Sequence, residues 1–223
     1  MEIFPDPLIE YDFENVYRPS DDTYLIIDYL RYHVDTTYFD GLPLENVSHI
    51  LDMGTGTGYV ALFLLILKQK LEKFNPKVYA SDILPEAIRL AKTNEALNKF
   101  SGQIKFLTSD LFTSFPPELK HQFDVIIFNP PYLPSSKQIL TKRKIDFSWE
   151  GGEKGFEVFL SFLDQVRVFI NPQRRSYLYY ITSTRLDLET FYSLVQEKDF
   201  ENTVLEKRHV FMEDILLNRI IME

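Results

Sequence analysis

The sequence FDVIIFNPPY, residues 123–132, combines a buried strand with a rigid polar turn. Five of the six residues Phe123–Phe128 are apolar, which is typical of a central strand of a parallel sheet that is covered on both faces. Pro130 and Pro131 exclude a helix or a continuing central strand, and they hold the backbone of the preceding residue extended. We therefore expect Asn129 at the carboxyl end of this strand, where ligands bind in open α/β sheets.

Strands and helices alternate along the rest of the chain. Strands are predicted over residues 49–52, 77–83, 103–109, 123–128 and 176–182, and helices over 24–34, 59–74, 86–99, 156–170 and 186–198. Two further strands, 203–211 and 214–222, are joined by a short turn and are therefore antiparallel. This order predicts an α/β fold with a doubly wound, seven-stranded, mostly parallel sheet that ends in a C-terminal antiparallel hairpin.

The segments between these elements predict the domain organisation and the loops of the chain. Residues 1–16 are acidic and contain two prolines, so we expect a disordered or loosely docked N-terminal arm, followed by a single domain over residues 17–223. Residues 35–47 are expected to be a polar connection, and residues 133–155 a long loop of the kind that is usually functional. This loop contains five basic residues, Lys137, Lys142, Arg143, Lys144 and Lys154.

Composition narrows the class of protein. The chain of 223 residues has a formal net charge of −9, which gives no general attraction for a nucleic-acid backbone. It contains no cysteine, which excludes disulfides, cysteine-ligated zinc and thiol catalysis. The apolar run Val60–Leu67 is too short to cross a bilayer, and the first residues do not resemble a signal peptide, so we expect a cytoplasmic protein without a membrane partner.

A glycine-rich turn, DMGTGTG at residues 52–58, lies between a predicted strand and a predicted helix. Gly54 and Gly56 let a ligand approach the backbone, and the helix N-terminus supplies donors. Asp52 lies before the glycines and Asp82 at the end of the next strand, where a carboxylate can accept hydrogen bonds from ribose hydroxyls. This arrangement is common to sites for NAD and for S-adenosylmethionine (AdoMet). The G-x-G-x-G spacing, without a second nucleotide-binding half, favours AdoMet; a tight turn without a ligand is the alternative.

The turn Asn129-Pro130-Pro131-Tyr132 indicates which chemical group would accept a methyl group from AdoMet. An exocyclic NH₂ group is a weak nucleophile because its lone pair is delocalised, and a carboxylate base is of little use to it. Two acceptors, the Asn129 oxygen and the Pro130 carbonyl, would orient the nitrogen and stabilise its growing positive charge. Tyr132 can stack on a planar group. Such a reaction needs no metal, and the four histidines are not spaced as metal ligands.

With these motifs the sequence resembles the class I AdoMet-dependent methyltransferases with an NPPY motif, which have a Rossmann-like fold. It is most similar to the HemK/PrmC-like release-factor glutamine methyltransferases in their short archaeal and eukaryotic form. The resemblance is carried by the glycine-rich and NPPY turns and by VYRPSDDT at 16–23, SDI at 81–83, DL at 110–111 and WEGG…G at 149–155. The first and last of these four blocks are the more discriminating ones.

The resemblance implies roles for individual residues. It implies AdoMet contacts at Thr23, Asp52, Gly54, Asp82, Asp110, Leu111 and Asn129, and a substrate-amide site at Asn129, Pro130, Pro131 and Tyr132. The residues alone allow Asp110 to accept from the adenine amino group with Leu111 against the ring, or to cap a helix. The implied substrate is the glutamine of a Gly-Gly-Gln motif in a translation release factor, although lysine methylation of histones is also reported in this family.

The resemblance also implies a partner, a small zinc-binding activator subunit that would pair along an edge of the sheet. The candidate edge is the predicted strand 103–109, which carries Ile104, Phe106 and Leu107. Two other functions stay open at this point. The first is a nucleic-acid methyltransferase that acts on the planar amines of adenine or guanine in tRNA, rRNA or DNA. The second is a non-catalytic scaffold that binds AdoMet.

Overall fold

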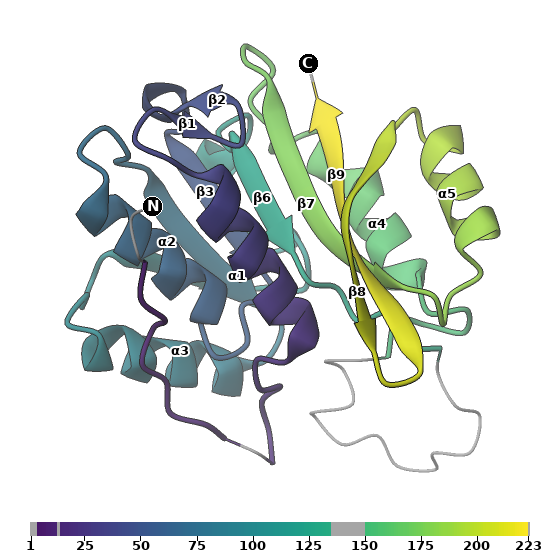
Figure 1. Ribbon diagram of the computed structural model, residues 1–223, viewed down its shortest axis with the longest axis horizontal. Helices are drawn as coiled ribbons and strands as arrows, with labels where there is room; N and C mark the ends of the chain where they lie inside the picture. The colour runs from purple at the N-terminus through teal and green to yellow at the C-terminus, as the bar shows by residue number, and fades with distance from the viewer. Residues whose placement is uncertain (1–3, 13, 135–149, 223) are drawn as a thin grey trace.

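The computed structural model describes residues 4–12, 14–134 and 150–222. Seven strands form one sheet in the order β5-β4-β3-β6-β7-β9-β8 (Figure 1). The strands from β5 to β7 are parallel, and β9 is antiparallel to both β7 and β8, so the predicted sheet and its closing hairpin are confirmed. The strands are β3 (His49–Met53), β4 (Lys77–Asp82), β5 (Ile104–Thr108), β6 (Val125–Phe128), β7 (Ser176–Ser183), β8 (Asn202–Val210) and β9 (Glu213–Met222).

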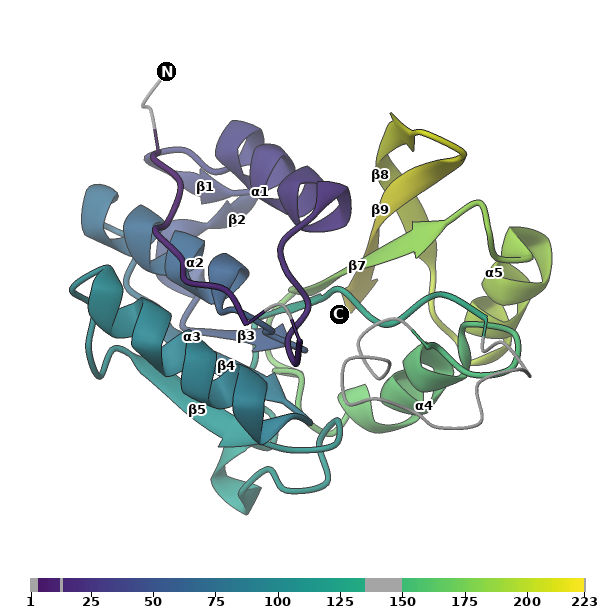
Figure 2. The same ribbon diagram turned by 90° about the horizontal axis from the view of Figure 1, so that it is seen from below.

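Helices cover both faces of the sheet (Figure 2). One face is covered by α1 (Asp21–His33), α2 (Tyr59–Lys70) and α3 (Pro85–Leu97), and the other by α4 (Glu157–Val166) and α5 (Leu188–Glu197). Alternate residues of β6 point to two separate cores: Val125 and Ile127 pack in the core of α1 and α2, and Ile126 and Phe128 in that of α4 and α5. The apolar run of β6 is therefore explained by its two buried faces.

Three of the predicted helix ends differ from the structure by three or more residues, each for a local reason. The first helix begins at Asp21, because the backbone carbonyl of Ser20 at the N-cap position accepts the first helical hydrogen bond, from the N–H of Tyr24 at 2.9 Å. The second ends at Lys70, because Leu71 is extended and the backbone N–H of Phe74 bonds to the Leu71 carbonyl. The fourth ends at Val166, because Ile170 forms a parallel bridge with Phe123.

The segment 35–47, expected to be a polar connection, contains a small hairpin of β1 (Tyr38–Phe39) and β2 (Leu42–Pro43), followed by a 3₁₀ turn, η1 (Leu44–Asn46). Asp40 and Gly41 form its turn with φ values of 47° and 88°, which is the usual chemistry of a two-residue hairpin turn. Phe39 is completely buried. The prediction missed this Asp-Gly signal because the flanking strands are only two residues long. A second 3₁₀ turn, η2 (Pro117–Leu119), precedes β6.

The N-terminal arm is bound to α3 more specifically than predicted. Residues 4–12 contain no helix or strand, but they run beside α3 (Figure 2), where Asn94 and the C-cap residue Asn98 hold their backbone. The N–H of Leu8 donates to Asn98 Oδ1 at 2.9 Å, and the N–H of Glu10 to Asn94 Oδ1 at 2.7 Å. Phe4 is buried in the core. The part of the arm that the structure describes is thus docked rather than loose. In the described ranges we find no helix with the length and apolar character that spanning a membrane requires.

Candidate functional site

A cavity of about 370 Å³ opens at the carboxyl edge of the sheet, a size typical of small-molecule sites. It lies where β3, β4 and β6 end, and the segments before α1 and after β5 complete its wall. Every residue that the sequence singled out for cofactor or acceptor binding lines this cavity: Thr23, Asp52, Gly54, Gly56, Asp82, Asp110, Leu111, Asn129, Pro130, Pro131 and Tyr132. The fold thus brings residues from five separate stretches of sequence to one site.

Asp52 holds the glycine-rich turn in place. Its buried Oδ2 accepts a hydrogen bond from Thr55 Oγ1 at 2.6 Å and from the N–H of Ala61 at 3.2 Å, so the carboxylate links the turn to the start of α2. Burial raises the pKa of Asp52 to about 7. Gly54 adopts a φ of 66°, and a Cβ there would lie 3.4 Å from the Phe128 ring. The turn therefore passes close to β6.

Asp82 supports the same turn from the next strand. Its Oδ2 accepts from the N–H of Gly56 and its Oδ1 from the N–H of Leu84, both at 2.9 Å. Burial raises the pKa of Asp82 as well. A carboxylate has about four acceptor positions, so Asp82 can accept further bonds from ribose hydroxyls in the cavity. Asp110 and Leu111, which follow the neighbouring strand β5, also line the cavity, and Leu111 has a φ of 46° and is half-buried.

Asn129 presents an acceptor that the described part of the chain leaves unused. Its Oδ1 is buried, and no described residue donates a hydrogen bond to it. Leaving such a group unsatisfied costs about 1–3 kcal/mol, and Asn129 is held in this position by the strand that precedes it and the two prolines that follow. The geometry therefore favours a ligand that brings an N–H donor to this oxygen.

Two residues of the site were missed as functional candidates, Tyr17 and Asp22. The Asp22 carboxylate is buried, and its Oδ2 accepts from the hydroxyls of Tyr17 at 3.0 Å and of Tyr132 at 3.2 Å. Its Oδ1 accepts from the N–H of Thr23 at 2.6 Å. Burial, reinforced by the Asp22 charge, raises the pKa of both tyrosines, so both hydroxyls stay protonated and donate. Asp22 thus connects the segment before α1 to the NPPY turn.

By itself, an acid in the first turn of a helix, as at Asp22, is explained by its favourable interaction with the helix dipole. The signal that could have identified it was the tyrosine five residues earlier, in the same block as Thr23.

The glycine segment after residue 149 packs its backbone against the NPPY turn. The N–H of Gly151 donates to the Leu133 carbonyl at 2.9 Å, and Glu150 lines the cavity. A Cβ on Gly151 would lie 2.4 Å from the Pro131 carbonyl oxygen, so only glycine allows this approach. Trp149 and the basic residues Lys137, Lys142, Arg143 and Lys144 lie outside the described residues.

Residues 37–165 match the family "Methyltransferase small domain". The protein is a member of this methyltransferase family. As a methyltransferase of this family it uses AdoMet, and the residues present fit that cofactor: an open glycine turn, a buried carboxylate with spare acceptor positions, and an apolar wall. Asp82 would hold the ribose, Asp110 and Leu111 the adenine, and the glycine-rich turn the amino-acid end.

Comparison with individual proteins shows which methyltransferases are similar to this chain. It is 28% identical over 205 residues to the human "Methyltransferase HEMK2", covering 91% of this chain and 88% of the human one. It is 32% identical over 145 residues to the "Release factor glutamine methyltransferase" of Koribacter versatilis, covering 63% of this chain and 49% of that protein. The chain thus spans about half the length of this bacterial relative.

A solved structure shares the fold. A chain of the E. cuniculi Mtq2–Trm112 complex, which is responsible for the methylation of the eRF1 translation termination factor, superimposes with a TM-score of 0.62. The sequence identity is 23%, and the match covers 93% of this chain and 99% of that chain. Within the described residues of our chain, no group of three or more His, Asp or Glu side chains is arranged to hold a metal ion.

Proposed function

We propose that this methyltransferase methylates the side-chain amide nitrogen of a protein glutamine, in the Gly-Gly-Gln motif of a translation release factor. The observation that carries the proposal is the buried Asn129 Oδ1, which no described residue uses. A neutral amide nitrogen brings two N–H donors, and Oδ1 can accept one of them. The names of relatives, release factor glutamine methyltransferase among them, support the same acceptor.

The chain's own residues would then act by orientation and charge stabilisation. Bound AdoMet supplies an electrophilic methyl group on sulfur and a thioether leaving group. Asn129 Oδ1 and the Pro130 carbonyl accept the two amide N–H bonds and turn the nitrogen lone pair toward the cofactor side of the cavity. As the N–C bond forms, positive charge grows on nitrogen, and these two acceptors stabilise it until a proton passes to water. Tyr132, held by Asp22, gives the planar amide a face to pack against.

The test is methyl transfer from labelled AdoMet to a purified release factor. We expect one methyl group on the glutamine of Gly-Gly-Gln, located by mass spectrometry, and none on a release factor with Gly-Gly-Asn at this site. The same assay with tRNA, rRNA and histones distinguishes the other acceptors. Preferential labelling of a nucleic-acid amine or a lysine would show that the proposed acceptor is wrong.

We further propose that a small activator subunit, zinc-binding as in the resemblance above, pairs along β5. This strand is at the end of the sheet and hydrogen-bonds only to β4 among the strands of that sheet (Figure 1). A shallow hollow beside it is lined by Tyr79, Phe106 and Leu107, with Lys92 over the Phe106 ring at 5.8 Å. An unpaired strand edge next to half-buried apolar side chains favours addition of a strand from a partner.

Phe106→Asp tests this second proposal. We expect the variant to lose a co-expressed activator during gel filtration while it still binds AdoMet. Val168→Asp, at an exposed valine just after α4, is the matched control and should retain the activator. A stable complex with Phe106→Asp would place the partner elsewhere.

A further inference from the structure

The turn between β8 and β9 exposes two large apolar side chains. Phe211 is 91% and Met212 76% exposed, the two highest values among the exposed large hydrophobic residues that the structure describes. They are the two residues that connect Val210 to Glu213, so they form the tip of the hairpin. Apolar side chains that no neighbour covers are typical of an interaction site when they occur together.

The same tip contradicts the usual turn chemistry. A two-residue hairpin turn with a positive φ at its first position normally has glycine there. Phe211 occupies this position with a φ of 29°, so the turn carries backbone strain as well as exposed apolar area. Neither feature stabilises the fold. Departures from local rules without a gain in packing are expected at functional positions.

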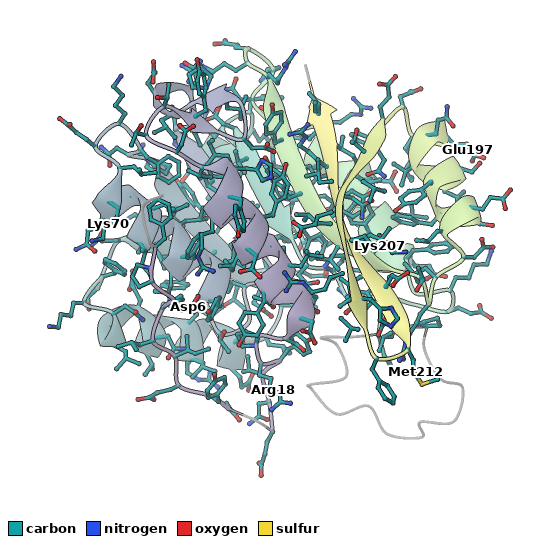
Figure 3. The ribbon with its side chains drawn as sticks, viewed as in Figure 1. Asp6, Arg18, Lys70, Glu197, Lys207 and Met212 are labelled. Carbon is teal, nitrogen blue, oxygen red and sulfur yellow. The ribbon has the colours of Figure 1, made fainter. Side chains whose placement is uncertain are left out.

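The hairpin tip lies at the edge of the sheet that contains the cavity. The antiparallel pairing places Ile215 of β9 opposite Ser183, at the carboxyl end of β7. Ser183 Oγ, at this end of β7, donates a hydrogen bond to Glu213, the residue that follows the tip. Figure 3 shows Met212 at the same edge of the molecule as Arg18, which follows Tyr17 of the cavity wall.

A second contact ties the hairpin to the site. Arg208 of β8 forms an ion pair with Asp28 of α1 at 2.7 Å, and α1 carries Asp22 and Thr23. At the base of the tip, Lys207 and His209 both contact Asp214. The hairpin is thus held in a fixed position relative to the cavity, and its apolar tip extends beyond these charged contacts.

We propose that Phe211 and Met212 dock the protein acceptor, by inserting into an apolar depression next to its target glutamine. This inference rests on the proposed function, because a protein acceptor must lie across the cavity mouth while one side chain enters. A single amide fits the cavity but offers little surface for recognition, and two large apolar residues at the same edge of the sheet would supply it. Burial of such anchors commonly dominates the affinity of an interface.

The test replaces the tip with the residues that the turn prefers. Phe211→Gly with Met212→Ser removes both side chains and relieves the backbone, so we expect an unchanged or higher melting temperature. The KM for the release factor should rise about tenfold, while kcat and the Kd for AdoMet stay within about twofold, since the lost contacts are equal in ground and transition state. The full chain is assayed, with an activator subunit if activity requires one.

Tyr32→Ser is the matched control. Tyr32 is 70% exposed near the end of α1, an end that contacts the β1 hairpin, and its loss should leave the KM unchanged. An unchanged KM for the tip variant would overturn the docking role, as would a change in oligomeric state without a change in KM, which would assign the tip to contacts between copies. If the wild-type chain labels no release factor, both the proposed function and the docking role are wrong.

Discussion

Asn129→Ala should separate activity from stability. Asn129 Oδ1 is buried without a donor from the described residues, so the folded protein carries a desolvation cost of about 1–3 kcal/mol at this atom. Alanine removes that cost together with the packing of the amide. We therefore expect the free energy of unfolding to change by less than about 1 kcal/mol, or about 2–4 °C in melting temperature for a domain of this size.

The effect on methyl transfer should be much larger. Loss of one acceptor for the developing charge costs about 10²–10³ in kcat, which corresponds to about 2.7–4 kcal/mol. The measurement is single-turnover transfer from labelled AdoMet to a release factor, together with thermal unfolding and AdoMet titration. The affinity for AdoMet should fall only slightly, because the hydrogen-bond acceptor Asn129 Oδ1 is assigned to the amide of the substrate.

Asn171→Ala is the matched control for this experiment. Asn171 Nδ2 donates to the buried Asp124 carboxylate at 2.9 Å, near the amino end of β6 and away from the cavity. Its loss should lower the melting temperature by about 5–10 °C, because a buried charged acceptor loses a donor worth about 2–3 kcal/mol. Its kcat should stay unchanged. If Asn129→Ala lowers stability as much as Asn171→Ala, or retains more than a tenth of the activity, the assignment of Asn129 Oδ1 to the acceptor is refuted.

Three further outcomes follow from the site. Burial raises the pKa of Asp52 from 3.8 to about 7, so between these two pH values the folded state holds a proton that the unfolded state releases. The free energy of unfolding, measured by denaturant titration, should therefore fall as the pH rises from about 4 to 7, and Asp52→Asn should flatten this slope. Asp22→Ala leaves two tyrosine hydroxyls without their acceptor, and we expect about 2–4 kcal/mol lower stability by denaturation and at least about tenfold weaker AdoMet binding by calorimetry. Gly151→Ala places a Cβ 2.1 Å from the carbonyl oxygen of Gly155, so kcat should fall at least about a hundredfold. Gly102→Ala, whose added Cβ would meet no atom within 4 Å, should retain wild-type activity.

The fold was predictable because its signals are local and repeated. The apolar run Phe123–Phe128 and the glycine turn before α2 each specify a strand that ends at the ligand edge, and the structure places both there. Parallel strands bring their carboxyl ends together, so the positions of Asp52, Asp82 and Asn129 around one cavity followed from the topology.

What the sequence did not reveal depends on contacts between distant segments. Asp22 and Tyr132 are 110 residues apart, and no local pattern indicates that a helix-start acid accepts from a tyrosine of the NPPY turn. The arm was expected to be loose because residues 4–12 lack periodicity, yet Asn98 and Asn94 each accept from the N–H and donate to the carbonyl of one arm residue, Leu8 and Glu10. The predicted strands 203–211 and 214–222 placed the hairpin turn one residue too late, so Phe211 was assigned to a strand and not to the exposed tip.

The strand order at the C-terminal side of the sheet also bears on how the chain is synthesised. β9 lies between β7 and β8 (Figure 1), although it is the last of the three to be made. β8 therefore has no place in the sheet until Glu213–Met222 has left the ribosome, and the edge of β7 stays open until then. An open strand edge invites pairing with other chains, so a ribosome that stalls over β9 would release an aggregation-prone protein.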